Sequence, residues 1–165
     1  MKTLHLIRHA KSDWSMTSQL DIQRPLNERG EQNCRLMAPY ILEAGCCFDH
    51  VFCSPALRAR STIELIDKAL ETEQIAWQFD NALYTFEASD IMNWCRQLDD
   101  SMGAVVIIGH NPALSELSNL LTGQTLIDLP TSSYAQLAIN THSWKSLASG
   151  TAQLVTLITP KMYQT

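Results

Sequence analysis

Arginine and histidine side chains stand out in this sequence as groups able to hold and transfer a phosphoryl group. Arg8 and His9 are adjacent near the start of the chain, and Arg58 and His110 follow at long intervals. Guanidinium groups match the oxygens of a phosphate, and free N–H groups at helix N-termini add to such a site. A neutral imidazole beside a phosphate can attack phosphorus and form a covalent phosphohistidine, which water later hydrolyses. We therefore predict a phosphate pocket in which His9 is the nucleophile.

Each of these groups follows a short apolar run that is typical of a buried strand. Leu4 to Ile7 leads into the first arginine and histidine pair, and Ala104 to Ile108 leads into the second histidine. A third run, about His50 to Cys53, precedes Ser54-Pro55, which we predict as the N-cap and first residue of the next helix. The C-terminal ends of strands in open α/β sheets converge on one crevice. We expect all these cationic and imidazole groups to face it.

The remaining pattern continues the alternation of strand and helix. Further helices are expected from Asn27 to Gly45, from about Ser89, and from Pro112 to Gly123, and further strands at Ile75–Phe79, Tyr134–Ile139 and Gln153–Ile158. The last two strands are expected to pair antiparallel at one edge. The sequence therefore predicts an α/β fold, a three-layer α/β/α sandwich with a mostly parallel central sheet and an antiparallel edge strand, in a single domain spanning 1–165.

Composition excludes several classes of protein. The formal net charge of −5 and the pI near 5.4 argue against nonspecific binding to nucleic acid or to an anionic membrane, since both need a broad basic surface. No apolar run approaches the roughly 20 residues that span a bilayer, and the N-terminus lacks the pattern of a signal peptide. We expect a cytoplasmic protein.

Other phosphatase chemistries fit the sequence less well. A cysteine nucleophile needs five residues between the thiol and its arginine, whereas four residues separate Cys53 from Arg58 and six separate it from Arg60. Metal-dependent hydrolysis needs a cluster of ligands, and no acidic ligand motif accompanies His110-Asn111. The five cysteines include no C-x-x-C pair, which argues against a zinc cluster or a disulfide framework. We therefore expect neither a metal nor another cofactor.

Taken together, these motifs resemble those of a known family. Arg8-His9-Ala10 is similar to an Arg-His-Gly motif, Ser12 and Trp14 match the residues that follow it, and Ser54 to Ala59 matches a Ser-Pro-x-x-Arg-Ala segment. His110 matches a second histidine. The pattern, over nearly the whole chain, resembles the histidine phosphatase superfamily, and most closely its small phosphohistidine phosphatases of the SixA type. The resemblance implies a phosphoglycerate-mutase-like fold.

The resemblance also implies roles for particular side chains. His9 would be the phosphorylated nucleophile, and Arg8, Arg58 and His110 would bind the phosphoryl group, with Ser12, Arg24 and Asn111 as further substrate-binding residues. Arg24 resembles an additional arginine of the small members. Ala10 departs from the motif glycine, which is a modest change if the backbone there does not require a positive φ.

The proton donor is the second departure from the pattern. Larger relatives that act on phosphate esters use a carboxylate after the third strand, and Glu87 is the candidate in the matching segment, Leu83 to Glu87. A site without an acid should prefer a good leaving group, such as the protonated imidazole of a protein phosphohistidine. We therefore predict a metal-independent phosphatase acting on phosphohistidine in a protein such as a histidine phosphotransfer domain.

Two alternatives stay open at this point. A general small-molecule phosphomonoesterase would act on small phosphorylated substrates and would need Glu87 or another carboxylate as its acid. A phosphate or phosphopeptide binding module would keep the pocket without turning substrate over. The sequence does not predict the oligomeric state.

Overall fold

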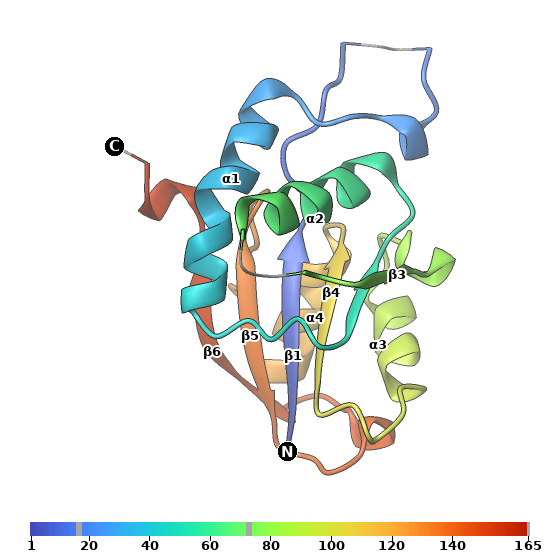
Figure 1. Cartoon of the computed structure of the whole chain (residues 1–165). Coiled ribbons are helices and arrows are strands. Elements are labelled where there is room, and N and C mark those ends of the chain that lie inside the picture. Colours follow the sequence, from blue (N-terminus) through green and yellow to red (C-terminus); the bar gives the residue numbers. More distant parts are fainter. Residues whose placement is uncertain (16–17, 72–73, 165) are drawn as a thin grey trace.

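A computed structural model describes residues 1–15, 18–71 and 74–164 of the chain. It contains one six-stranded sheet and four α-helices in the described residues (Figure 1). The strands are β1 (Lys2–Arg8), β2 (Val51–Cys53), β3 (Trp77–Phe79), β4 (Ala104–Gly109), β5 (Tyr134–Ile139) and β6 (Ala152–Ile158). The helices are α1 (Glu28–Glu43), α2 (Leu57–Ala69), α3 (Ala88–Arg96) and α4 (Ala113–Thr122). In these described ranges no helix is long and apolar enough to cross a membrane.

The sheet is mostly parallel, as predicted. Its strand order is β3-β2-β4-β1-β5-β6, and the first four strands pair in parallel. β5 pairs antiparallel with both β1 and β6, so the single reversed strand lies one place inside the edge. The turn before β5 lies against the end of β1, where the N–H of Arg8 donates to the carbonyl of Ser133 at 3.1 Å. A strand that starts at this end of the sheet must run back along β1.

Apolar side chains on both faces of the sheet make the three-layer arrangement. Met37 and Ile41 of α1 pack with Ile63 of α2 on one face, whereas Leu114 and Leu117 of α4 pack with α3 on the other. The central strands are therefore covered on both sides, which explains why β1 and β4 read as nearly continuous apolar runs. Figure 1 shows α1 and α2 in front of the sheet and α4 behind it.

Helix boundaries follow local hydrogen bonding. The Asn27 side chain accepts from the N–H of Gly30 at 2.7 Å, which confirms the predicted cap of α1. The predicted start of α2 at Ser54-Pro55 is wrong, because the helix begins at Leu57 after an extended Ala56. The hydroxyl of Ser54 is instead hydrogen-bonded to His110 and to the N–H of Ala56. This serine therefore belongs to the crevice rather than to the helix.

The order of the strands creates a crevice between β1 and β4. The crossovers that leave β1 and β2 use α1 and α2 on one face, and those that leave β3 and β4 use α3 and α4 on the opposite face. Arg8 pairs in register with Gly109, so the segments after the two strands leave the sheet side by side. Ligands in open α/β sheets bind at such a switch point.

Candidate active site

The backbone at the end of β1 holds Arg8 and His9 firmly. The N–H of His9 donates to the carbonyl of Gly109 at 3.1 Å, and the N–H of Ser132 donates to the carbonyls of both Arg8 and His9 at 3.2 Å. Ser132 is buried with a φ of 62°, a conformation that few residues other than glycine adopt. The turn before β5 thus braces the strand end that carries the histidine.

The His9 ring has one tautomer that fits its surroundings. Nδ1 lies 2.7 Å from the carbonyl oxygen of Ala10, and because a carbonyl only accepts, Nδ1 must carry the hydrogen. The lone pair is therefore on Nε2, which is the atom available for attack on phosphorus. Ala10 is itself held by its N–H, which donates to the Thr62 hydroxyl of α2 at 2.9 Å.

Alanine is compatible with the position after the histidine. Among the described residues other than glycine, only Ser132 has a positive φ, so the backbone at Ala10 does not require glycine. The side chain is fully buried in a small cluster with Leu26 and Cys34. The departure from the Arg-His-Gly motif is therefore accommodated by the local packing.

His110 lies beside His9, with the ring centroids 5.1 Å apart. Its Nε2 lies 2.7 Å from the Ser54 hydroxyl, which already accepts from the N–H of Ala56 and has one hydrogen to give. The consistent assignment is that Ser54 donates to Nε2, which leaves the hydrogen of His110 on Nδ1. That Nδ1 is buried without a partner among the described residues, and it is a donor suited to a phosphoryl oxygen.

Both histidines are held in the neutral form. Burial lowers the pKa of His9 to about 3, and the positive charges of Arg58, Arg8 and Arg24 lower it as well. The hydrogen bond to the Ala10 carbonyl raises this pKa but does not offset burial. The pKa of His110 also falls to about 3, first because the ring is buried and then because His9 and Arg58 lie close. A neutral imidazole is the form that a nucleophile on phosphorus requires.

Three arginines surround these rings. Arg58 is almost completely buried and Arg24 is buried with it, whereas Arg8 is partly exposed and donates from Nη1 to the carbonyl of Leu129 at 3.0 Å. The Nε atoms of all three are buried and have no partner in the described structure. Buried, unpaired guanidinium donors are costly, and an oxyanion with several oxygens satisfies them.

Asp21 is a part of this site that the sequence reasoning missed. It lies in a 3-10 helix, Asp21–Gln23, and its Oδ1 accepts from Arg24 Nη2 at 2.9 Å while Oδ2 accepts from Arg58 Nη2 at 2.9 Å. The hydroxyl of Tyr84 donates to Oδ2 at 2.5 Å. Burial opposes the charge, but the hydrogen bonds from Tyr84, Arg24 and Arg58 outweigh it, so the pKa of Asp21 lies well below its ordinary value.

The only available sequence signal for Asp21 was its place three residues before Arg24. The sequence from Ser15 to Gln23 is mostly polar and has no periodic pattern, and its residues Met16 and Thr17 lie outside the described ranges. The 42% exposed side chain of Asp21 carries no apolar pattern that would mark it. The long-range contact with Arg58 could therefore not be foreseen.

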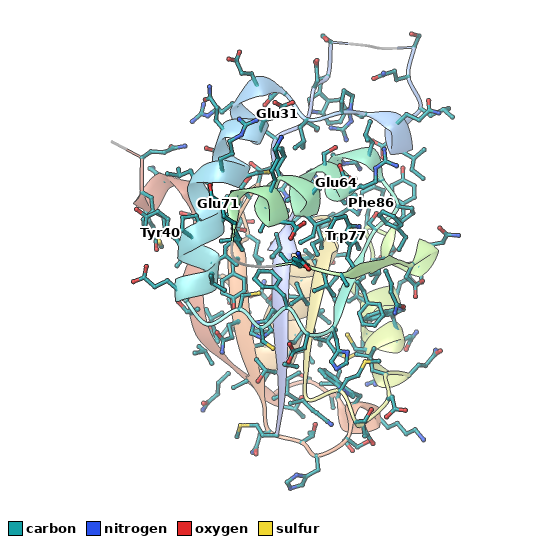
Figure 2. The ribbon with its side chains drawn as sticks, viewed as in Figure 1. Glu31, Tyr40, Glu64, Glu71, Trp77 and Phe86 are labelled. Atoms are coloured by element: carbon teal, nitrogen blue, oxygen red, sulfur yellow. The ribbon has the colours of Figure 1, made fainter. Side chains whose placement is uncertain are left out.

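These groups line a pocket of about 520 Å³. Its described lining consists of Arg8, His9, Lys11, Ser12, Trp14, Asp21, Arg24, Asn27, Arg58, Phe86, Asn111 and Thr131. The rings of Trp14 and Phe86 are exposed members of this lining. Trp14 stacks on the Arg24 guanidinium at 3.6 Å. The ring of Phe86, labelled in Figure 2, has its centroid 5.5 Å from that of His110. His110 is not among these described lining residues, but its ring lies against that of His9.

The other predicted substrate-binding residues reach the pocket but also hold its walls. The Ser12 hydroxyl accepts a hydrogen bond from Arg24 Nη1. Asn111 donates from Nδ2 to the carbonyl of Leu129 at 2.8 Å, and its Oδ1 accepts from both the N–H and the hydroxyl of Ser115. Asn111 therefore fixes the segment after β4 in place.

Glu87 is not brought into the pocket. It is exposed at the N-terminal end of α3, and it does not belong to the described lining residues, although its neighbour Phe86 does. Arg60 is also outside, where it pairs with Glu64 at 3.6 Å. Burial raises the pKa of the Cys53 thiol to about 12, so this cysteine stays protonated and unreactive.

Potential metal ligands do not gather in this structure. Within residues 1–15, 18–71 and 74–164, no three His, Cys, Asp or Glu side chains form a group that could hold a metal ion.

Comparisons with known proteins establish the family of this chain. The chain belongs to the histidine phosphatase superfamily (branch 1), whose profile matches residues 4–91, more than half of the 165 residues. An uncharacterized protein of Mycobacterium tuberculosis is 27% identical over 165 residues, which cover 94% of this chain and 100% of the relative. The 2,3-bisphosphoglycerate-dependent phosphoglycerate mutase 2 of Lactiplantibacillus plantarum is 29% identical over 90 residues, covering 51% of this chain and 39% of the mutase.

Solved structures share the whole fold. The protein histidine phosphatase SixA complexed with tungstate aligns with a TM-score of 0.80 and 21% identity, covering 98% of this chain and 99% of the other. A protein of Agrobacterium tumefaciens that carries the SixA name has the same TM-score with 22% identity, over 96% and 98% of the two chains. A mycobacterial glucosyl-3-phosphoglycerate phosphatase aligns with a TM-score of 0.67 and 15% identity, over 93% and 97%. The fold is thus that of the phosphoglycerate-mutase-like histidine phosphatases.

Proposed function

We propose that this protein hydrolyses phosphohistidine in a phosphorylated protein, such as a histidine phosphotransfer domain, through a covalent phosphohistidine at His9. The family supports a phosphatase, and the fold it shares with SixA phosphohistidine phosphatases supports this substrate. The observation that carries the proposal is that the described lining of the pocket has one carboxylate, Asp21, and that its hydrogen bonds from Tyr84 and two arginines hold it ionised.

The geometry suits a two-step transfer. The Nε2 lone pair of His9 forms the new P–N bond while the bond from phosphorus to the substrate imidazole breaks, and the imidazole leaves with that electron pair. Arg8, Arg24 and Arg58 lie around the pocket and balance the charge on the phosphoryl oxygens, and Nδ1–H of His110 donates to one of them. Water then attacks the phosphorus of phosphorylated His9, which releases inorganic phosphate and regenerates the neutral ring.

The ionised state of the carboxylate in the described pocket lining favours a substrate with a good leaving group. Asp21 is the sole carboxylate among the described lining residues, and its lowered pKa keeps it ionised. An ionised carboxylate that accepts hydrogen bonds from two arginines is a poor proton donor. An alkoxide needs a proton to leave, whereas a phosphorylated imidazole that is already protonated leaves as a neutral ring. The site therefore suits a phosphoramidate better than an alkyl phosphate.

The test compares two substrates under the same conditions. A protein phosphorylated on histidine and an alkyl phosphate such as glycerol phosphate are assayed for release of inorganic phosphate. We expect kcat/KM to be about 10²–10⁴-fold higher for phosphohistidine, the range that a missing general acid accounts for. His9→Asn should abolish both activities.

Glu87→Gln is the matched control. Because Glu87 lies outside the pocket, this variant should hydrolyse phosphohistidine at the wild-type rate. Comparable rates on both substrates, together with a large loss on the alkyl phosphate in Glu87→Gln, would establish a general phosphomonoesterase instead. Binding of phosphate without turnover of either substrate would make the protein a binding module.

A further inference from the structure

A second, basic cavity of about 330 Å³ adjoins the phosphate pocket. The two share Lys11 and Thr131 in their walls. We call this cavity the basic groove and define it by Lys11, Arg29, Thr131, Pro160 and Lys161. It is formed where the segment after β1, the first turn of α1 and the C-terminal segment meet.

The basic groove has a local charge opposite to that of the chain. Lys11, Arg29 and Lys161 are all exposed, and its described lining contains no Asp or Glu. None of these three cations lies within 4.0 Å of a carboxylate of the described residues. The chain as a whole carries a net charge of −5, so this concentration of positive charge beside the phosphate pocket does not follow from composition.

The backbone segments that carry the three cations are held together by packing. The ring of Tyr163 stacks on Tyr40 of α1 with centroids 3.7 Å apart, and Gln164 Nε2 donates to the buried Asn33 side chain at 3.0 Å. These contacts fix the C-terminal segment that carries Lys161 against α1, and Figure 2 shows Tyr40 on the side of α1 that faces this segment. Gly30 packs directly on the Lys11 backbone, which holds the backbone of its neighbour Arg29 close to that of Lys11.

The basic groove differs from the phosphate pocket in that its cations are exposed. The pocket uses buried guanidinium donors, which suit a tightly held phosphoryl group, whereas the basic groove offers exposed charges on flexible side chains. Each exposed charge contributes little binding free energy. Such charges act mainly on the rate and specificity with which a partner associates, when that partner is anchored elsewhere. Such a site fits the side chain of a polypeptide whose phosphorylated residue already occupies the neighbouring pocket.

We propose that the basic groove binds an acidic side chain of the protein substrate, close to its phosphohistidine. This inference rests on the proposed function. It adds a feature of the substrate, an acidic side chain near the phosphohistidine, that the residues around His9 do not recognise. The carboxylate of an Asp or Glu would lie among Lys11, Arg29 and Lys161, while the phosphoryl group lies against His9.

The test uses two phosphohistidine peptides that differ only in having Asp and Glu, or Asn and Gln, around the phosphorylated residue. Arg29→Gln with Lys161→Gln should raise KM for the acidic peptide about 3- to 10-fold, the scale expected for two exposed charges, and leave kcat unchanged. The neutral peptide and the small compound phosphoramidate should be hydrolysed as by wild type. Lys68→Gln with Lys145→Gln, which removes two exposed cations elsewhere, is the control.

Binding measurements separate this inference from the proposed function. The affinity of acidic and neutral peptides that carry a stable phosphohistidine analogue is measured with the same variants. Wild type should bind the acidic peptide more tightly than the neutral one, and the double variant Arg29→Gln with Lys161→Gln should lose this preference. That result would support binding of an acidic side chain in the basic groove even if the protein turns over no substrate. Equal affinity for the two peptides, or an equal loss for both in the variant, would overturn it.

Discussion

Asp21 links the two buried arginines of the pocket through one carboxylate. Arg58 is 1% exposed, and its charge is balanced by the Asp21 side chain, while the Asp21 carbonyl accepts from Nη1 at 2.8 Å. These bonds use the Nη atoms and leave the Nε atoms of Arg24 and Arg58 free for a ligand. Asp21 therefore serves as the counter-charge of Arg24 and Arg58.

Asp21→Asn should destabilise the protein when no phosphate is present. The amide keeps the shape of the side chain but leaves Arg58 without a counter-charge, and the half-exposed position of Asp21 limits the loss to about 1–2 kcal/mol. Inorganic phosphate supplies the missing negative charge, so it should raise Tm more in Asp21→Asn than in wild type. Thermal unfolding with and without phosphate measures both effects.

Glu87→Gln removes a nearby but exposed carboxylate and is the control for this experiment. It should shift neither Tm nor the response to phosphate. An unchanged Tm in Asp21→Asn, or an equal phosphate response in all three proteins, would show that Asp21 does not stabilise the arginines.

The residues of the pocket differ in how far the sequence predicts them. Arg8 and His110 each follow an apolar run, so their place at a strand end could be read before the structure was known. Asp21 and Tyr84 lie in segments with no periodic pattern, and their contact joins positions that are 63 residues apart. Only the folded chain brings them together.

At the scale of elements, α1 packs closely on the segment after β1 through Gly30. A Cβ on Gly30 would lie 2.2 Å from the Lys11 carbonyl oxygen, which is backbone and cannot move aside as a side chain would. The same carbonyl accepts from the N–H of Asn27 at 3.0 Å. The N-terminus of α1 thus fixes the segment that carries Lys11 and Ser12 along the pocket.

Gly30→Ala should lower the free energy of unfolding by about 2 kcal/mol, because the overlap with the Lys11 backbone exceeds the gain in helix propensity. The displaced segment should also weaken the binding of inorganic phosphate. Urea unfolding and phosphate titration measure the two effects.

Gly103→Ala is the matched control for Gly30→Ala. A Cβ on Gly103 meets nothing within 4 Å, so its stability should stay within about 0.5 kcal/mol of wild type. If Gly30→Ala were as stable as Gly103→Ala, the close packing of α1 on this segment would not constrain the site.

The elements themselves were predictable where periodicity and capping agree. The Asn27 cap and the apolar face of α1 gave that helix its correct start, and Gly123 ends α4 with a φ of 73°. The start of α2 was placed too early because Ser54-Pro55 has the composition of a helix N-terminus. The serine is used by His110 instead, a contact over 56 residues that no local pattern contains.

At the scale of the whole molecule, buried neutral histidines couple folding to pH. Burial lowers the pKa of His5 to about 4, and the pKa values of His9 and His110 are about 3. An unfolded chain binds protons at these histidines near pH 6.5, well above the folded values. Between these limits the unfolded state binds more protons, so stability decreases as pH falls.

The free energy of unfolding should therefore be nearly constant above pH 7 and should decline as the pH falls from about 6.5 toward 4. Each buried histidine contributes at most about 1.4 kcal/mol per pH unit. Urea unfolding at pH 7.5, 6.0 and 5.0 measures this slope, and His9→Asn should make it shallower. Stability that does not change between pH 7.5 and 5.0 would contradict the neutral burial of these rings.

Covalent phosphorylation of His9 is the central claim and can be measured directly. Wild-type protein is mixed with a substrate carrying ³²P on histidine and quenched within one turnover, and the labelled peptide is then located. We predict phosphate on His9 that is stable to alkali and labile to acid, and no label in His9→Asn. Hydrolysis of the substrate without label on His9, or label that persists in His9→Asn, would contradict the account.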